Sequence, residues 1–116
     1  MADSEFDIKT INDDSRLIQT GRVLDNSNAD GLSSLLMELN SAEVKYVVID
    51  MARLEFLSST GIGSILGTVA LIRERSGEVV LTNVPNNIMH ILDIVDLTNY
   101  LTICQSTEEA TARCGM

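Results

Sequence analysis

Short extended runs of apolar residues open the chain. Apolar side chains recur among polar ones over residues 6–11, the polar pair Asp13-Asp14 follows, and a second extended run covers residues 17–24. Two such runs on either side of a turn signal predict a hairpin of two strands. Gly21 lies inside the second run and indicates a bulge or a close approach of the backbone.

A helix and a buried strand come next. Residues 25–28 are helix-capping types, and apolar side chains then recur at spacings of three and four. We therefore expect an amphipathic helix that ends near Asn40. Residues 44–51 contain a continuous apolar run rich in β-branched side chains. Such a run is typical of a central strand that is covered on both faces, as in parallel sheets.

The same alternation continues through the second half of the chain. We expect a helix from Ser59 or Thr60 to Gly77, because Gly77 follows a polar, basic last turn. The later elements we expect are a strand at residues 78–82, a helix at 86–95 that Pro85 opens, a strand at 101–104 and a helix at 106–112 capped by Ser106. Strands that alternate with helices predict an α/β layer with right-handed crossovers, folded as a single domain over residues 1–116.

The composition narrows the possible functions. The chain has 116 residues and a net charge of −9 with no run of Lys or Arg, so we expect no nucleic-acid partner. The acidic surface suits either solubility alone or a partner with basic patches. The N-terminus has no signal-peptide pattern, and no apolar stretch approaches the roughly 20 residues of a membrane-spanning helix. We therefore expect no membrane partner. Cys104 and Cys114 form no CxxC pair, so we also expect a cytoplasmic protein with reduced thiols.

Patterns for catalysis and cofactor binding are weak. The only histidine, His90, stands between apolar residues, and nothing near it in the sequence indicates a nucleophile. Gly61, Gly63 and Gly67 follow a buried strand, but they form G-x-G-x-x-x-G without the lysine of a phosphate loop. We interpret Gly63 and Gly67 as positions where a helix approaches the sheet closely. The sequence therefore predicts no enzyme, no metal site and no bound cofactor.

Three successive hydroxyls, on Ser58, Ser59 and Thr60, stand at an expected helix N-terminus directly before Gly61. One hydroxyl is enough for an ordinary N-cap, so three indicate an exposed turn. The helix dipole and free N–H groups would stabilise a phosphate there by roughly 0.3–1 kcal/mol. A partner that closed over the phosphate without a cation would lose about 2–5 kcal/mol. The turn therefore predicts a non-catalytic binding protein in which phosphorylation keeps the fold and ends binding.

The segment DMARLEFLSSTGIG, from Asp50 to Gly63, resembles the signature of STAS-domain anti-sigma factor antagonists. In that family a strand ends in Asp, a short loop follows, and an Asp-Ser-Ser/Thr-Gly-Leu/Ile-Gly turn begins a helix. Upstream, GRVLD at residues 21–25 is similar to the family's segment before its first helix. The resemblance covers nearly the whole chain and implies a STAS-like fold. That fold is a mixed β-sheet of about four or five strands with an N-terminal hairpin and about four helices packed on it.

The resemblance implies a bacterial partner-switching regulator. When unphosphorylated, such a protein binds an anti-sigma factor that is also a serine kinase, and so releases the sigma factor. Phosphorylation by that kinase ends the binding, and a dedicated phosphatase restores it. The resemblance puts the phosphoacceptor at Ser59, with Ser58 and Thr60 as alternates. The partner-binding residues that it implies are Asp25, Leu57, Ser58, Thr60, Gly61, Ile62 and Gly63.

Two other functions remain open from the sequence. The chain could be a non-switching STAS subunit that docks on a transport or lipid-trafficking complex. Ser58 slightly favours this reading, because the family usually has Asp before the acceptor. It could also be a small hydrolase or nucleotide-binding protein, which would need a catalytic pocket that these residues do not assemble.

Overall fold

Five strands form the central sheet in the order β1-β2-β4-β6-β7, in a computed structural model that describes residues 6–113. The hairpin pairs β1 (Asp7–Asn12) antiparallel with β2 (Ser15–Gln19). The strands β2, β4 (Tyr46–Asp50), β6 (Glu78–Thr82) and β7 (Thr102–Cys104) are parallel neighbours in that order. The continuous apolar run predicted as a central strand is β4, which lies in the middle of the sheet.

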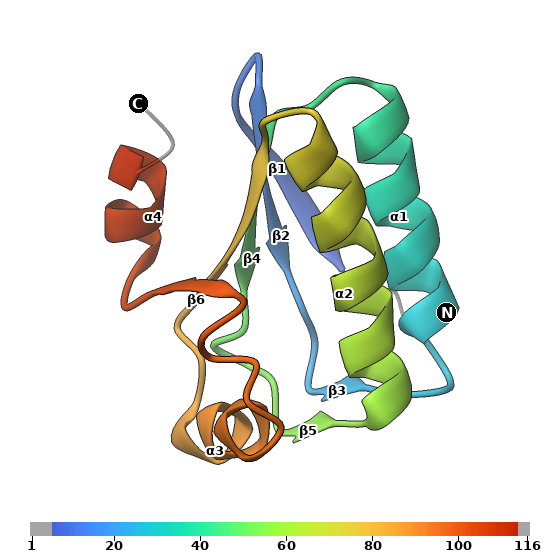
Figure 1. Cartoon of the computed structure of the whole chain (residues 1–116), viewed down its shortest axis with the longest axis vertical. Helices are drawn as coiled ribbons and strands as arrows, with labels where there is room; N and C mark the ends of the chain where they lie inside the picture. Colours follow the sequence, from blue (N-terminus) through green and yellow to red (C-terminus); the bar gives the residue numbers. More distant parts are fainter. Residues whose placement is uncertain (1–5, 114–116) are drawn as a thin grey trace.

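Helices cover both faces of the sheet (Figure 1). α1 (Ala29–Ser41) and α2 (Ser59–Glu74) pack against each other on one face, and α4 (Thr107–Arg113) packs on the other. α3 (Asn86–Ile94) lies beyond the carboxyl ends of the parallel strands. The predicted fold class, a mixed sheet with an N-terminal hairpin and four helices, is confirmed. Among residues 6–113, no helix combines the length and the apolar character that spanning a bilayer requires.

The main hydrophobic core lies between the sheet and the pair α1 and α2. Burying one of its aliphatic side chains fully stabilises the fold by roughly 1.5–3 kcal/mol. Its fully buried members include Ile18, Leu36, Ile49, Ile72 and Leu81. A smaller cluster under α4 contains Val48, Val80, Cys104 and Ala110. Aliphatic packing on both faces therefore fixes the carboxyl edge of the parallel strands, where the candidate site lies.

The extended run predicted over residues 17–24 is two strands rather than one. The main-sheet strand ends at Gln19, and β3 (Val23–Leu24) pairs in parallel with β5 (Phe56–Leu57) in a separate two-stranded sheet. The chain leaves the main sheet where the amide of Thr20 donates to the carbonyl oxygen of Asp50. The register irregularity of the hairpin falls between Thr10 and Asn12. Gly21, where a bulge or a close approach of the backbone was expected, lies between β2 and β3 and belongs to neither strand.

The end of α2 explains the glycine at position 77. The helix ends at Glu74, and the residue with a left-handed backbone is Ser76, at φ 64°. A β-carbon on Gly77 would collide with the carbonyl oxygen of Lys45, which accepts the amide of Glu78 at 2.9 Å. Gly77 is therefore required by this close approach of the segments that lead into β4 and β6.

Candidate functional site

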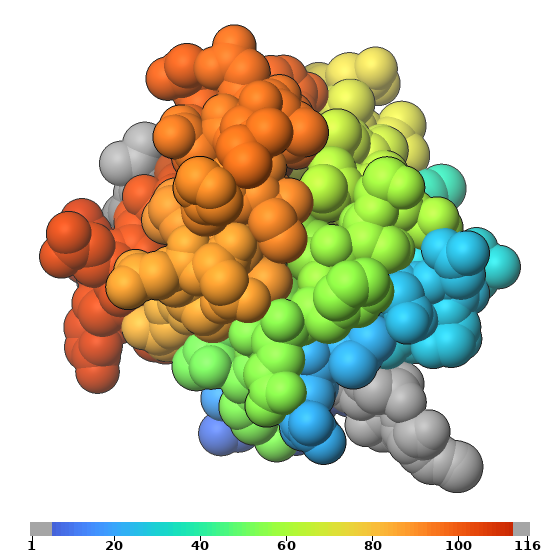
Figure 2. All heavy atoms as spheres, turned by 90° about the horizontal axis from the view of Figure 1, so that it is seen from below, coloured from blue at the N-terminus to red at the C-terminus, as the bar shows by residue number. Residues whose placement is uncertain are grey.

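The candidate site is the turn that joins β5 to α2, together with the segment that leaves β3. Leu24 and Leu57 are partners in the parallel β3–β5 pair, and the amide of Ser58 donates to the carbonyl oxygen of Leu24 at 2.9 Å. Asp25 and Ser58, which follow these partners, therefore leave the pair side by side. In Figure 2, which views the molecule from this end, the segment after β3 (blue), the turn into α2 (green) and α3 (orange) lie next to one another.

Ser58 is the N-cap of α2. Its backbone is extended, and its Oγ accepts a hydrogen bond from the amide of Gly61 at 3.1 Å. Its carbonyl oxygen accepts the first helical bond, from the amide of Ile62 at 3.0 Å. Ser59 and Thr60 occupy the first two helical positions, and both are exposed. The three hydroxyl residues thus divide into one that caps the helix and two that are exposed to solvent.

At Gly61 the backbone of α2 packs tightly against β3. The residue is buried, and a β-carbon there would lie 2.7 Å from the carbonyl oxygen of Leu24 and 2.9 Å from its Cγ. Contacts that short force the backbone to shift, so only glycine fits this position. The absence of a side chain at Gly61 therefore allows the turn and β3 to pack this closely.

Gly63 and Gly67 do not serve the packing role expected for them. Both are exposed, and a β-carbon on either would find no atom within 4 Å. The buried face of α2 is instead formed by Ile65, Val69 and Ile72. The expectation that these two glycines bring the helix close to the sheet is therefore wrong.

Asp25 presents a carboxylate beside the turn. Its Oδ1 accepts hydrogen bonds from the hydroxyl of Ser27 at 2.6 Å and from the amide of Ser27 at 2.8 Å. Both bonds lower the pKa of Asp25, and the bond from the hydroxyl contributes more than the bond from the amide. Asn28 stabilises the same segment, since its side chain accepts from the amide of Asp25 and donates to the carbonyl oxygen of Val23. Residue 28 precedes α1, but its side chain makes no capping bond to that helix.

An exposed apolar pair lies next to the turn. Val23 and Phe56 are cross-strand partners in the β3–β5 pair, and 36% and 52% of their respective surfaces are exposed. Arg22 and Glu55 flank the pair with two hydrogen bonds of 3.1 Å, and Arg22 lowers the pKa of Glu55, first through its hydrogen bonds and then through its charge. This pair could not be predicted from the sequence, because two-residue strands are too short to show a period. An aromatic side chain beside three hydroxyls was the available signal.

Groups for metal or catalytic chemistry do not gather at this turn. Across the part of the chain that the structure describes, no three His, Cys, Asp or Glu side chains are placed to hold a metal ion. His90 is exposed on α3. What the turn offers is hydroxyls, a carboxylate, bare helix backbone and an apolar pair, which is the chemistry of a protein-binding surface.

Comparison with known proteins identifies the class. The chain belongs to the STAS domain family, whose sequence pattern matches residues 6–110. A Bordetella bronchiseptica protein, BtrV, which is assigned as an anti-sigma factor antagonist, is 27% identical over 90 residues, which are 78% of this chain and 78% of that protein.

Solved structures share the fold. A Thermotoga maritima protein assigned as an anti-sigma factor antagonist superposes with a TM-score of 0.87 at 18% identity, covering 95% of this chain and 94% of that one. The Bacillus cell fate determinant SpoIIAA, solved in a phosphorylated form, superposes with a TM-score of 0.76 at 19% identity. That match covers 94% of this chain and 98% of SpoIIAA.

Proposed function

We propose that this chain is an anti-sigma factor antagonist that acts by partner switching in the bacterial cytoplasm. In its unphosphorylated form it binds an anti-sigma factor that is also a serine kinase, and the sigma factor is released. The kinase phosphorylates the turn and so ends the binding, and a phosphatase restores it. The name of the Bordetella relative supports the antagonist role, and the phosphorylated form of SpoIIAA supports the switch.

One observation carries the proposal: Ser59 is exposed at the first position of α2, while the hydroxyl of Ser58 is engaged as the cap. A kinase must reach the acceptor oxygen from solvent, so this division favours Ser59 over Ser58. Thr60, also exposed, is the alternate acceptor. Ser58 stands where the family usually has Asp, and both residue types are strong N-caps, so the substitution keeps the capping role.

Phosphorylation at Ser59 would act on binding more than on folding. A phosphate there carries about −1.5 to −2 charge next to free N–H groups at a helix N-terminus, which favour an anion. It would also lie near Asp25, which like any exposed aspartate is ionised at neutral pH and whose pKa is lowered further by its hydrogen bonds from Ser27. A partner that desolvates the added phosphate charge without a cation would lose about 2–5 kcal/mol, or about thirtyfold to a few thousandfold in affinity.

The proposed partner surface has an exposed layer and a supporting layer. Asp25, Thr60, Ile62 and Gly63 retain solvent contact and would meet the partner directly. Leu57 and Gly61 are buried and Ser58 caps the helix, so these three would act by holding the exposed residues in place.

The test is binding and phosphate transfer with the serine-kinase anti-sigma factor encoded nearest to this chain's gene. Ser59→Ala should bind persistently and accept no phosphate, whereas Ser59→Asp should keep the wild-type circular dichroism spectrum and lose binding. Wild-type affinity in Ser59→Asp would refute the switch. No phosphate on Ser58, Ser59 or Thr60 would point instead to a non-switching STAS subunit.

A further inference from the structure

The carboxyl edge of the main sheet carries a buried carboxylate that the proposed function does not use. Asp50 is the last residue of β4, and only 8% of its surface is exposed. Its Oδ1 accepts from the amide of Ala52 at 3.0 Å and from Nδ2 of Asn83 at 3.1 Å, and its Oδ2 accepts from Nε2 of Gln19 at 3.2 Å. All three donors are uncharged, and burying a carboxylate costs free energy. The burial of this carboxylate is therefore best explained by the segments that its hydrogen bonds connect.

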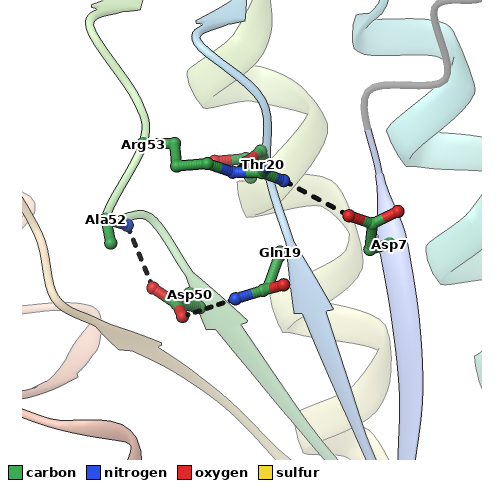
Figure 3. A network of polar contacts seen from close by, with 6 residues as sticks. All are labelled: Asp7, Gln19, Thr20, Asp50, Ala52 and Arg53. Carbon is green, nitrogen blue, oxygen red and sulfur yellow. Dashed lines mark hydrogen bonds and ion pairs between the residues drawn. The ribbon is translucent and has the colours of Figure 1, made fainter.

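Asp50 joins three segments that end at the same edge. Gln19 ends β2, Asn83 follows β6, and the amide of Ala52 belongs to the loop that leads to β5 and the turn. Figure 3 shows the carboxylate of Asp50 between the side chain of Gln19 and the start of this loop. A backbone hydrogen bond joins the ends of β2 and β4 as well, because the amide of Thr20 donates to the carbonyl oxygen of Asp50 at 3.1 Å.

The loop has a second attachment on the β2 side. Nε of Arg53 donates to the carbonyl oxygen of Thr20 at 3.2 Å, and its outer nitrogen reaches Asp7 at 3.4 Å (Figure 3). The Asp7 contact is between exposed side chains and adds little stability. Asp50 is buried, so its bonds are the firmer attachment at the base of the loop.

Two segments of the chain therefore run side by side from the Asp50 carboxylate to the candidate site. Residues 19–25 and 50–58 begin at the Gln19–Asp50 hydrogen bond and meet again in the β3–β5 pair. They end at Asp25 and Ser58, the two positions that border the turn. The relative placement of those ends depends on both attachments, because the residues between them form no strand of the main sheet.

We infer that Asp50 is a positioning residue that fixes the turn and Asp25 relative to each other. That this turn is the partner surface rests on the proposed function, whereas the positioning itself is a property of the isolated chain. Removing the hydrogen bonds that this side chain makes should loosen residues 52–60 before it unfolds the strands.

Hydrogen exchange followed by NMR on the isolated chain tests this inference. In Asp50→Ala, protected amides among residues 52–60 should exchange about tenfold faster relative to those of β4 and β6, which report global unfolding. Asp50→Asn should largely restore protection, because its oxygen can serve Ala52 and Asn83 while Gln19 turns its own oxygen toward the new amide. The matched control is Thr82→Val on the neighbouring strand, whose buried hydroxyl has no hydrogen-bond partner in the structure.

Two results would overturn the inference: a uniform increase in exchange across the chain in Asp50→Ala, or the same local loosening in Thr82→Val. If Asp50→Ala does not fold, Gln19→Met removes a single donor and should give the local effect alone. Because no partner is present, a negative result rejects the role of Asp50 and leaves the proposed switch standing. Conversely, a failed switch experiment would leave the exchange pattern unchanged.

Discussion

Replacing Gly63 with alanine should make the protein more stable and its proposed binding weaker. Gly63 lies on the exposed side of α2, one turn beyond Ser59, and an added β-carbon would meet no atom within 4 Å. A glycine inside a helix costs about 0.5–1 kcal/mol relative to alanine, and nothing in the fold offsets that cost here. We attribute the glycine to the partner, which would approach the helix backbone closely at this point.

The magnitude follows from the structure. Gly63→Ala should raise the free energy of unfolding by about 0.5–1 kcal/mol, which corresponds to about 2–5 °C in the melting temperature of a domain this size. Gly61→Ala should do the opposite, because its β-carbon would lie 2.7 Å from the carbonyl oxygen of Leu24. Overpacking of that kind costs about 1–3 kcal/mol.

Urea unfolding and calorimetric titration with the proposed kinase partner measure the two effects separately. We expect Gly63→Ala to bind about tenfold more weakly, a loss of about 1.4 kcal/mol. Gly67→Ala is the control, since it should gain the same stability one turn further from the site and keep its affinity. Wild-type affinity in Gly63→Ala would remove this residue from the partner surface. A loss of stability in Gly63→Ala would refute the conclusion that Gly63 lies on an open face of α2.

Three further predictions concern the turn and its neighbours. Ser58→Ala should lower the free energy of unfolding by about 0.5–2 kcal/mol in urea titrations, while Ser58→Asp, which can also cap, should stay close to wild type. Phe56→Ala should lower the free energy of unfolding by about 1 kcal/mol, because roughly half of the side chain is buried, and cost more than about 1 kcal/mol of partner affinity in calorimetry, because the other half is exposed beside the turn. Ser27→Ala should raise the pKa of Asp25 toward the ordinary value of an aspartate, because the hydrogen bond from the Ser27 hydroxyl is lost; an NMR titration measures the change. With Ser27 present, the stabilisation from these bonds holds at neutral pH and is lost only as pH falls through the lowered pKa.

Much of the fold could be predicted from the sequence because its larger elements show clear periods. The run at residues 44–51 predicted β4, and the helices α1, α2 and α3 followed from apolar spacing and end signals. The pair β3–β5 could not be predicted this way, since each strand has two residues and no period to detect. Its formation depends on a contact between segments about thirty residues apart, which local patterns do not reveal.

The candidate site was predicted in part. The hydroxyl-rich turn at the start of α2 is where the sequence indicated, but which hydroxyl caps the helix is decided by backbone geometry at Ser58. Gly63 and Gly67 were assigned to the wrong face because their spacing shows only that they share a face. The positions of Ile65, Val69 and Ile72, which are buried, already pointed to the opposite side of the helix. Asp50 could be predicted only as a strand end, because two of its three hydrogen-bond donors come from other strands or loops that are distant in the sequence.

The separate β3–β5 pair has a consequence for how such proteins can diverge. Val23 and Phe56 project from a sheet that shares no strand with the main one, so side chains there can change without repacking the aliphatic core. A cell with several related regulators needs each to avoid the others' partners, and such discrimination comes from differences at contact positions. As part of the proposed partner surface, this small sheet would give duplicated copies a place to acquire new pairings while folding stays under separate selection.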